Sequence, residues 1–465
     1  MTKVLHVLQT YFQDSIGGTE IYVRGLATRL LERGVDCVVC APGPSERAYE
    51  HSGVRVRRFA GMAPAFEFDH VYGDGDPVAA EAFCRILDEE KPDLVHAHAL
   101  TAEVSLAAAR AVKSRGIPLV FTYHSAATTC AVGTLLKDRR QPCAGRLEAR
   151  ACAACNLRRL GMPKPLSGIV GRVPPAIGKI VGRSGIRGRP ATALRMQELI
   201  ARKHAAAREF LSLADALVAP SRWVRDLLVE NGVPVSKISL CGQGIEHSPV
   251  ERVPTARRTC LRIAALARLD AMKGMHILLE ALRARPALDV RLDIFVAPPA
   301  GVETAYGRRL RREASGDARV RLLPPLAHEA VVRALADYDA VAVPSQVLET
   351  GPLVVLEAFA AKTPVIASDL GGIAERVSHG VDGLLIPPFE ADAWGSAIER
   401  LARDPALLAR LRAGVPDVPS MDDVTEAMHS LYARLWAATA AVPVASTTSA
   451  GGASRSAGHF EWIPA

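Results

Sequence analysis

Residues 344–357 read PSQVLETGPLVVLE, and this stretch decides the fold class. The apolar run Ala340–Pro344 has the composition of a buried strand, and the apolar residues after Pro352 indicate a helix. Strand, loop and helix in this order form the unit of a parallel α/β sheet, whose ligands bind at the carboxyl ends of the strands. We expect Glu349 at the mouth of the helix and Glu357 deeper along it, on one face if the segment is helical throughout, although two solvated glutamates are the simpler interpretation.

Two further junctions between a strand and a helix flank this stretch. Arg268 and Lys273 follow the predicted strand Leu261–Leu266, and an arginine fork with a lysine ammonium at a strand end suits a diphosphate. Pro364–Ala367 is predicted as the last strand before the C-terminal helices, and the glycine turn at 371–372 follows it. Each feature alone also fits ordinary surface residues. The prediction of a binding site therefore depends on their occurrence in one α/β half.

The N-terminal half repeats the alternation of apolar strands and helices. Its predicted strands are Lys3–Gln9, Val35–Cys40, Asp93–Ala97, Ile117–Tyr123, Ala214–Ala219 and Ile238–Cys241. Gly17 and Gly18 lie between the first strand and the predicted helix Glu20–Arg33, where glycine lets backbone approach a ligand and a helix start favours an anion. A plain tight turn is the alternative. The fold class predicted is α/β, with two Rossmann-like domains facing each other across a cleft.

Composition places the domain boundaries. The N-terminal domain is predicted over residues 1–248, a polar linker with two prolines over 249–259, and the C-terminal domain over 260–420. Residues 421–441 are predicted to form a helix that packs back on the N-terminal domain. Residues 442–465 are rich in Ala, Ser, Thr and Gly, which predicts a disordered tail.

Length and composition indicate a globular chain of more than one domain. With 465 residues, 49% of them hydrophobic and 23% charged, the chain is too long for a single core and ordinary in composition. The apolar run near the start is too short for a signal peptide, and no run approaches the ~18 apolar residues of a spanning helix. Nine scattered cysteines do not form a disulfide framework. We therefore expect a cytoplasmic protein.

Together these segments resemble the donor half of glycosyltransferase family 4 (glycosyl transferases group 1), retaining enzymes with the GT-B fold. The shared motifs are an Arg-Leu run followed by Lys-Gly (268–274), a Glu-x7-Glu pair (349–357), an Asp-x-Gly-Gly-x-x-Glu run (369–375), and the segments 219–225, 231–234 and 382–387. The resemblance covers most of residues 1–440. Two residues depart from the family pattern: Ala267 replaces a common Gly, and Pro352 removes a backbone N–H that often contacts the donor.

The resemblance implies roles for individual residues. Arg268 and Lys273 would bind the diphosphate of a UDP- or GDP-sugar, and Glu357 the ribose hydroxyls. Glu349 would bind the transferred sugar near the reacting carbon, and His124 matches a family histidine that contacts the same sugar. The catalytic set is thus predicted as Glu349, His124, Lys273 and Arg268. The donor-binding set adds Glu357, Gly17, Gly18, Thr350, Gly351 and Leu353.

The expected chemistry needs no bound divalent ion. A departing nucleoside diphosphate requires charge stabilisation, which Arg268, Lys273 and helix N-termini can supply. His96 and His98 share a strand face and could form a metal pair, but the resemblance makes them scaffold or acceptor-cleft residues.

The expected acceptor is a saccharide or a lipid-linked saccharide, in polysaccharide or glycolipid synthesis. The N-terminal domain would form the acceptor side of the cleft. Two other functions stay open: a sugar-nucleotide 2-epimerase of the same fold, and a non-catalytic subunit that binds a nucleotide sugar.

A segment rich in Cys and Arg, about 129–195, interrupts the N-terminal alternation and is predicted as an insertion. Its cysteines are Cys130, Cys143, Cys152 and Cys155. The last two have the spacing of metal ligands, and four thiolates suit structural zinc. An iron–sulfur cluster, or unliganded thiols in an irregular loop, are the alternatives. The cluster starts six residues after His124, so we expect it to shape the acceptor side.

The same segment is strongly basic. Residues 149–197 contain ten Arg or Lys, interleaved with aliphatic residues, and no Asp or Glu. This pattern favours an anionic membrane surface, with a solvated loop as the alternative. Aromatic residues for base stacking are lacking, so we expect no nucleic-acid partner. A peripheral position on the inner face of the plasma membrane, near a lipid-linked acceptor, follows from this interpretation.

Overall fold

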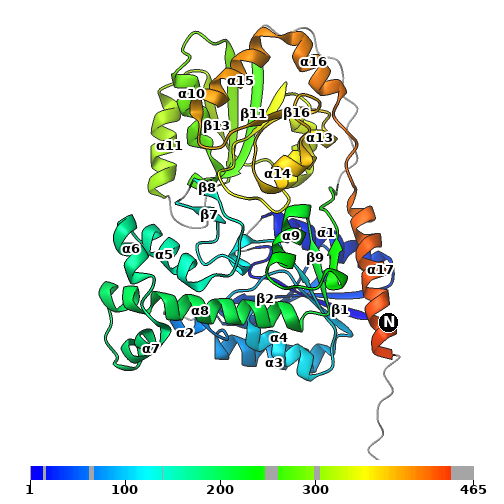
Figure 1. Cartoon of the computed structure of the whole chain (residues 1–465). Coiled ribbons are helices and arrows are strands. Elements are labelled where there is room, and N and C mark those ends of the chain that lie inside the picture. Colours follow the sequence, from blue (N-terminus) through cyan, green and yellow to red (C-terminus); the bar gives the residue numbers. More distant parts are fainter. Residues whose placement is uncertain are drawn as a thin grey trace, which may run out of the picture.

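The computed structural model describes residues 2–13, 17–61, 68–138, 140–246, 260–297 and 304–440, and it contains two α/β domains placed one above the other (Figure 1). The predicted linker and the predicted tail lie outside these residues. The N-terminal strands are β1 (Lys3–Val7), β2 (Asp36–Gly43), β3 (Arg47–His51), β4 (Val54–Ala60), β5 (Leu94–Ala97), β6 (Leu119–Thr122), β9 (Ala216–Ala219) and β10 (Ile238–Leu240). They form one sheet in the order β10-β9-β6-β5-β1-β2-β4-β3, parallel except for the pair β3–β4.

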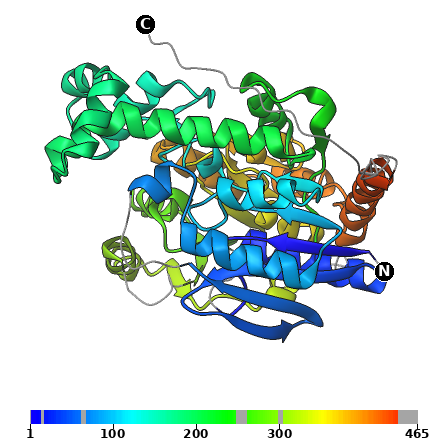
Figure 2. The ribbon, with the colours of Figure 1, turned by 90° about the horizontal axis from the view of Figure 1, so that it is seen from below.

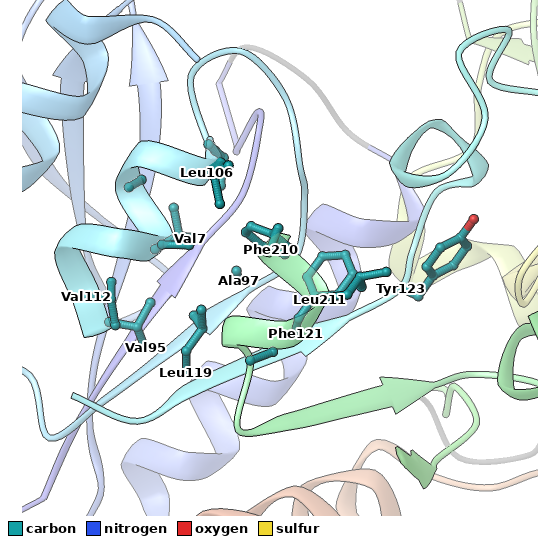
Figure 3. Close-up of a cluster of buried hydrophobic side chains, with 14 of the residues drawn as sticks. Val7, Val95, Ala97, Leu106, Val112, Leu119, Phe121, Tyr123, Phe210 and Leu211 are labelled. Carbon is teal, nitrogen blue, oxygen red and sulfur yellow. The ribbon is translucent and has the colours of Figure 1, made fainter. Parts of the chain in front are cut away.

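Hydrophobic residues cover both faces of this sheet because side chains alternate along each strand. One face packs against α3 (Pro77–Glu90), α4 (Leu106–Ser114) and α8 (Arg189–Leu213). Figure 3 shows this core, in which the rings of Phe121 and Phe210 meet edge to face at 5.0 Å. The other face packs against α1 (Gly18–Glu32). All residues of the central strands β5, β6 and β9 are buried, as expected for a parallel sheet covered on both sides.

Between β6 and β9 the chain forms a short turn η1 (Ala126–Thr128), a hairpin and four helices. The hairpin strands are β7 (Leu136–Lys137) and β8 (Gln141–Pro142), and the helices before α8 are α5 (Ala149–Arg159), α6 (Lys164–Val170) and α7 (Pro175–Arg183). Most of residues 149–213 are therefore helical, so the alternative of an irregular loop does not describe this part. Ala, Arg and Leu favour helix, and prolines occupy the first turns of α6, α7 and α8, where the missing N–H costs nothing.

The C-terminal domain has a six-stranded parallel sheet. Its strands are β11 (Leu261–Arg268), β12 (Val290–Ala297), β13 (Val320–Leu323), β14 (Ala340–Val343), β15 (Val365–Ser368) and β16 (Gly383–Ile386), in the order β13-β12-β11-β14-β15-β16. Its helices are α10 (Met275–Arg283), α11 (Ala305–Ser315), α12 (Val331–Leu335), α13 (Leu353–Ala360), α14 (Gly371–Arg376), α15 (Ala391–Arg403) and α16 (Pro405–Ala413). Helices cover both faces of the sheet in this domain also (Figure 1).

The prediction that the strand at 364–367 is the last one is wrong, because β16 follows it at the sheet edge. β16 has only four residues and pairs on one side, so its apolar run is short. Gly383 at its start leaves no room for a side chain, since a Cβ there would lie 2.6 Å from the carbonyl oxygen of Val365.

Helix α17 (Met421–Ala440) leaves the C-terminal domain and lies along the N-terminal one (Figures 1 and 2). Met421, Val424, Met428 and Leu431 are buried in the cluster that also contains residues of β1, β2 and α1. The hydroxyl of Tyr432 lies 2.6 Å from Nδ1 of His96 on β5. The N-terminal domain therefore contains residues from both ends of the chain. Among the described residues, no helix combines the length and the hydropathy that a membrane span requires.

Candidate active site

A cavity of about 690 Å³ lies between the two domains. The start of α1 forms its N-terminal wall, and the ends of β11 and β14 with the start of α13 form its C-terminal wall. The predicted residues that line it are Gly17, Gly18, Arg268, Lys273, Glu349, Gly351, Leu353 and Glu357. Thr350 and His124 do not line it. The predicted donor residues of the two domains thus meet around one space.

Lys273 and Glu349 form an ion pair at the centre of the C-terminal wall. Nζ of Lys273 lies 2.5 Å from Oε1 of Glu349, and the hydroxyl of Ser345 donates to the same oxygen at 2.6 Å. Burial alone would raise the pKa of Glu349, but the Lys273 ammonium and the Ser345 hydroxyl hold it below its ordinary value. Glu349 is therefore a carboxylate that is fixed in position and keeps its charge.

Close backbone contacts shape the loop that carries Glu349. Gly274 has φ +73°, and a Cβ there would lie 1.8 Å from the carbonyl oxygen of Pro344, so only glycine fits. On the other side, the N–H of Gly372 donates to the carbonyl of Glu349 at 2.8 Å. The Lys-Gly and Gly-Gly motifs of the sequence thus hold the loop from two sides.

Glu357 lies in α13, which begins at Leu353, so Glu349 precedes the helix and the two glutamates do not share a helix face. Burial raises the pKa of Glu357 to about 7. The charge of the neighbouring His328 lowers this pKa, but by less than burial raises it. Nδ1 of His328 lies 3.7 Å from Glu357, and its Nε2 lies 3.0 Å from Glu246, which also pairs with Arg24 of α1. Glu357 is the carboxyl group of this wall that takes up a proton near neutral pH.

Arg268 ends β11 and is exposed toward the cavity. Its guanidinium has no carboxylate partner in the described part of the chain, whereas Lys273 is paired with Glu349. The positive charge of Arg268 still lowers the pKa of Glu349, as a smaller effect after those of Lys273 and Ser345. The guanidinium of Arg268, next to the Lys273–Glu349 ion pair, suits an anionic ligand.

The N-terminal side carries a chain of hydrogen-bonded histidines. Nδ1 of His6 lies 3.2 Å from Nε2 of His98, and Nδ1 of His98 lies 3.1 Å from Nε2 of His124. Burial lowers the pKa of His6 and His124 to about 3 and that of His98 well below its ordinary value. The rings are therefore neutral, and each ring donates to the next in one common direction. His98 and His124 line a second cavity of about 230 Å³, next to the first.

His6, His96 and His98 are the one group of described residues whose potential metal-ligating atoms all lie within 4.8 Å of one another. Both ring nitrogens of His96 are used, however. Its Nδ1 lies 2.6 Å from the Tyr432 hydroxyl, and its Nε2 lies 2.7 Å from Oγ1 of Thr122. A neutral ring bonded on both sides has no lone pair to offer a metal. These contacts fit the scaffold role expected for His96.

Three contacts join the domains beside the site. The Thr350 hydroxyl donates to the carbonyl of His124 at 3.0 Å, and Nε1 of Trp223 donates to the carbonyl of Glu349 at 3.2 Å. Glu375 accepts from the N–H groups of Arg222 and Trp223, at 2.7 and 2.6 Å, and so caps α9 (Arg222–Glu230). Thr350 thus links the domains instead of lining the donor cavity.

Sequence reasoning missed the individual roles of Ser345, His328 and Glu375. Ser345 lies two residues after the end of β14, and a position at the carboxyl end of a strand is a signal for a site residue. His328 carries no such signal, because its place opposite Glu246 depends on how the two domains meet. Glu375 was noticed only as the last residue of a motif, and its partner lies about 150 residues away in the chain.

The four clustered cysteines line a third cavity, of about 430 Å³. All are half-buried free thiols. Burial raises the pKa of Cys152 to about 12, and the charges of Cys130, Cys143 and Cys155 nearby act in the same direction. The structure thus brings together the four residues that the sequence singled out as metal ligands.

Two family models match the chain: Glycosyl transferases group 1 over residues 253–416, and Glycosyltransferase Family 4 over residues 16–157. A D-inositol 3-phosphate glycosyltransferase of Actinosynnema mirum is 27% identical over 90% of this chain and 92% of its own. With the relative of that name from Rhodococcus jostii, the match is 31% identical and spans 45% of this chain and about half (49%) of that protein.

Solved structures share the fold over nearly the whole chain. Sucrose-phosphate synthase of Thermosynechococcus elongatus has a TM-score of 0.65 at 20% identity, covering 94% of this chain and 100% of that chain. The Anabaena protein HepE, crystallised with UDP and glucose, has a TM-score of 0.61 at 18% identity, covering 93% and 100%. At this level of identity the likeness concerns the fold, which is that of two facing α/β domains.

Proposed function

Because the chain belongs to glycosyltransferase family 4 and is a transferase of the GT-B fold, we propose that it moves a sugar, with retention, from a nucleoside diphosphate sugar to a saccharide acceptor. The observation that carries the proposal is the cavity between the domains, which combines a free guanidinium, a lysine–glutamate pair and a helix start. In this cavity the diphosphate binds Arg268 and Lys273. Their positive charges stabilise the negative charge that develops on the leaving group.

The remaining residues of the cavity place the nucleoside and the sugar. The carboxyl group of Glu357 accepts from the ribose hydroxyls, about one turn into α13 and away from the reacting carbon. Glu349 accepts from hydroxyls of the transferred sugar, and its bond to Ser345 fixes the carboxylate in the required orientation. Gly17 and Gly18 allow the start of α1 to approach the donor closely.

His124 acts on the sugar as a neutral hydrogen-bonding group. Its Nε2 is held by His98, and its buried Nδ1 has no partner among the described residues. The adjoining cavity of about 230 Å³ receives the acceptor, which attacks from the face that the diphosphate leaves. No side chain serves as a covalent nucleophile in this scheme, since Glu349 is held by Lys273 and Ser345.

The donor is a UDP- or GDP-sugar, and we place UDP first because HepE was crystallised with UDP and glucose. A thermal-shift series with UDP-, GDP- and ADP-sugars tests this assignment. We expect a UDP-sugar to raise the melting temperature of the protein and to have a smaller effect on Lys273→Ala. Absence of any shift with all three nucleotides would overturn the donor proposal.

Analysis of the sugar products separates the remaining functions. A transferase forms a new glycosidic bond only when an acceptor is present. Conversion of the donor to its C2 epimer without an acceptor would identify a 2-epimerase instead. Tight donor binding without turnover in the presence of saccharide and lipid-linked acceptors would indicate a binding subunit.

We further propose that the acceptor is lipid-linked and that α5–α7 contact an anionic membrane surface. These helices form a projection beyond one end of α8 (Figures 1 and 2). Seven of the twelve large hydrophobic side chains exposed among the described residues lie between the end of α5 and the second turn of α8: Leu160, Leu166, Ile169, Ile177, Ile180, Ile186 and Leu194. Exposed cations surround them: Arg159, Lys164, Arg172, Lys179, Arg183, Arg187 and Arg189. Each cation contributes about 1 kcal/mol near anionic lipid.

Sedimentation with vesicles tests the membrane proposal. The protein should pellet with vesicles of phosphatidylcholine and phosphatidylglycerol at low salt, and less at high salt, because salt screens the charges. Ile169→Ser/Ile180→Ser should weaken pelleting, since these side chains are 67% and 66% exposed in the patch. Val235→Ser is the matched control, because Val235 is 63% exposed elsewhere. Protein that stays in the supernatant at both salt concentrations would contradict the proposal without affecting the donor assignment.

A further inference from the structure

The four cysteines Cys130, Cys143, Cys152 and Cys155 take no part in the proposed sugar transfer. They come from three separate parts of the chain: Cys130 follows η1, Cys143 follows β8, and Cys152 and Cys155 lie in helix α5. All four nevertheless line one cavity. No disulfide joins any two of them. Four thiols from three parts of the chain around one space require an explanation that the transfer reaction does not supply.

We propose that this tetracysteine cluster binds a thiophilic metal centre that fixes the wall of the acceptor cavity. Four thiolates form the ligand set of structural zinc, and the same four ligands can hold an iron–sulfur cluster. Zinc is the first choice because the proposed transfer moves no electrons.

The backbone holds the cysteines in place before any metal binds. The N–H of Cys130 donates to the carbonyl of Ala126 at 2.8 Å, and that of Cys143 donates to the carbonyl of Leu135 at the same distance. Cys152 and Cys155 lie on one face of α5, three positions apart. The N–H of Gly145 also donates to Sγ of Cys143 at 3.5 Å, a contact that stabilises a thiolate ligand.

Helix α5 itself is anchored without help from a metal. Ala153 and Leu157 pack against Met196 and Ile200 of α8. The segment that depends on the metal is therefore the stretch 129–148, before α5. A zinc ion also requires the side chains to turn inward, because Zn–S bonds of about 2.3 Å bring sulfurs to about 4 Å from one another. No three of the four sulfurs are within 4.8 Å of one another in this structure.

Cationic side chains lie around the cavity, where a zinc ion with four thiolates would place a net charge of about −2. The charged residues that line the cavity besides the cysteines are Lys137, Arg146, Arg158 and Glu148. Ion pairs with Glu230 and Asp138 hold Arg146 and Arg158 beside the cavity and offset their charges.

The cluster connects directly to the acceptor side. The hydroxyl of Tyr123 lies 2.7 Å from Oγ1 of Thr129, the residue before Cys130. Ser125, Ala127 and Thr128 line the cavity that we assign to the acceptor. Metal binding should therefore order one wall of the acceptor cavity and leave the donor cavity unchanged.

Elemental analysis of untagged protein, purified under reducing conditions without added metal, tests the proposal. We expect about one zinc per chain, or iron with acid-labile sulfide and absorbance near 400 nm; the two results separate an ion from a cluster. The metal content per chain of Cys152→Ser should be at least tenfold lower than that of wild type. The control Cys260→Ser should keep the wild-type content, because Cys260 lies outside the cluster. Wild-type protein that contains neither zinc nor iron would overturn the proposal. So would free thiols at all four cysteines of the cluster, or a disulfide between two of them.

A second measurement keeps the test independent of folding of the variants. A chelator that removes the metal from wild-type protein should speed amide exchange in residues 129–148 and leave exchange in α10 unchanged. Re-addition of zinc to chelated protein should restore the slow exchange if zinc is the native ion. Unchanged exchange after complete metal removal would show that the centre does not order this wall. The donor-induced thermal shift of chelated protein should stay as in the untreated protein, which separates this proposal from that of the donor site.

Discussion

The two domains have the same kind of parallel sheet but place opposite kinds of side chain at the edges that face each other. The C-terminal edge carries the charged groups Arg268, Lys273 and Glu349. The N-terminal side carries His98 and His124, which burial keeps neutral. The architecture therefore determines where ligands bind, and the side chains on the loops determine which ligand each half can take. A charged wall suits a diphosphate, whereas neutral imidazoles suit the hydroxyl groups of sugars.

The largest effect should come from the charged wall. Lys273→Ala removes the ammonium next to the departing diphosphate, and the rate of transfer should fall by about 10²–10³. The control Arg403→Ala also removes a cation, from an exposed pair with Glu399 in the same domain, and should keep the wild-type rate. Steady-state kinetics and circular dichroism of both variants check this prediction. Near wild-type turnover by folded Lys273→Ala would mean that the charge of Lys273 does not stabilise the leaving diphosphate, and that the charged wall has no special role in transfer.

Burial raises the pKa of Glu357, a carboxyl group of the charged wall, into the neutral range. Its titration should therefore be visible in the stability of the protein. Its pKa is about 7 in the fold against the ordinary 4.5. The stability that its neutral form provides is therefore complete below about pH 4.5 and is lost as the pH rises through about 7. Glu357→Gln should be more stable than wild type at pH 8, by about 3 kcal/mol, and equal to it at pH 4.5.

Thermal unfolding of both proteins across this pH range measures the difference. Bound nucleotide should reduce the difference in stability between Glu357→Gln and wild type at pH 8, because ribose hydroxyls favour the charged carboxylate. A constant difference between the two melting curves at all pH values would mean that Glu357 does not titrate in this range.

The neutral wall should respond more weakly. His98→Asn removes the ring that orients His124, and the loss of one hydrogen bond predicts a fall in kcat of about tenfold with little change in the KM of the donor. Because burial lowers the pKa of both rings, a step near neutral pH in the wild-type rate should come from Glu357, whose pKa is about 7, and should be absent in Glu357→Gln. His429→Asn on α17 serves as the control for the His98 variant. A step near neutral pH that persists in Glu357→Gln would mean that the histidines of this wall become charged.

The smallest effect concerns the contact between the walls. Glu375→Gln keeps one acceptor for the start of α9 but loses the charge there, which should cost about 1 kcal/mol. A decrease in melting temperature of a few degrees is expected, with a smaller one for the exposed Glu426→Gln. If both variants melt together, Glu375 contributes no more to holding the domains than a surface glutamate does.

The charged wall was easier to predict from the sequence than the neutral one. Arg268 ends β11, and Lys273 and Glu349 lie in the loops after β11 and β14, so the strand–loop–helix pattern places them at the same edge of the sheet. The chain of histidines is harder to predict, because His6 lies on β1 while His98 and His124 lie just after β5 and β6, so their contacts depend on the strand order. The order β6-β5-β1 places these three strands side by side.

Errors in the fold prediction have physical causes too. The helices α6, α7 and α8 within the predicted insertion were not assigned, because prolines occupy their first turns. The edge strand β16 was missed because a short strand with one neighbour needs few apolar residues. The role of Thr350 was assigned from its neighbours in the sequence. Its hydroxyl turns instead to the backbone of the other domain, a contact that only the packing of the domains determines.

The position of α17 has a consequence for how the chain folds during synthesis. Met421, Val424, Met428 and Leu431 complete a hydrophobic cluster whose other members are mostly residues of the first 60 positions. The ribosome makes these residues only after the whole second sheet. The cluster at α1 is therefore completed only at the end of synthesis, whereas the cluster on the opposite face of the same sheet needs no residue of α17. Until α17 arrives, the outer face of α1 stays uncovered, and a chaperone that binds apolar helices would find its binding surface there.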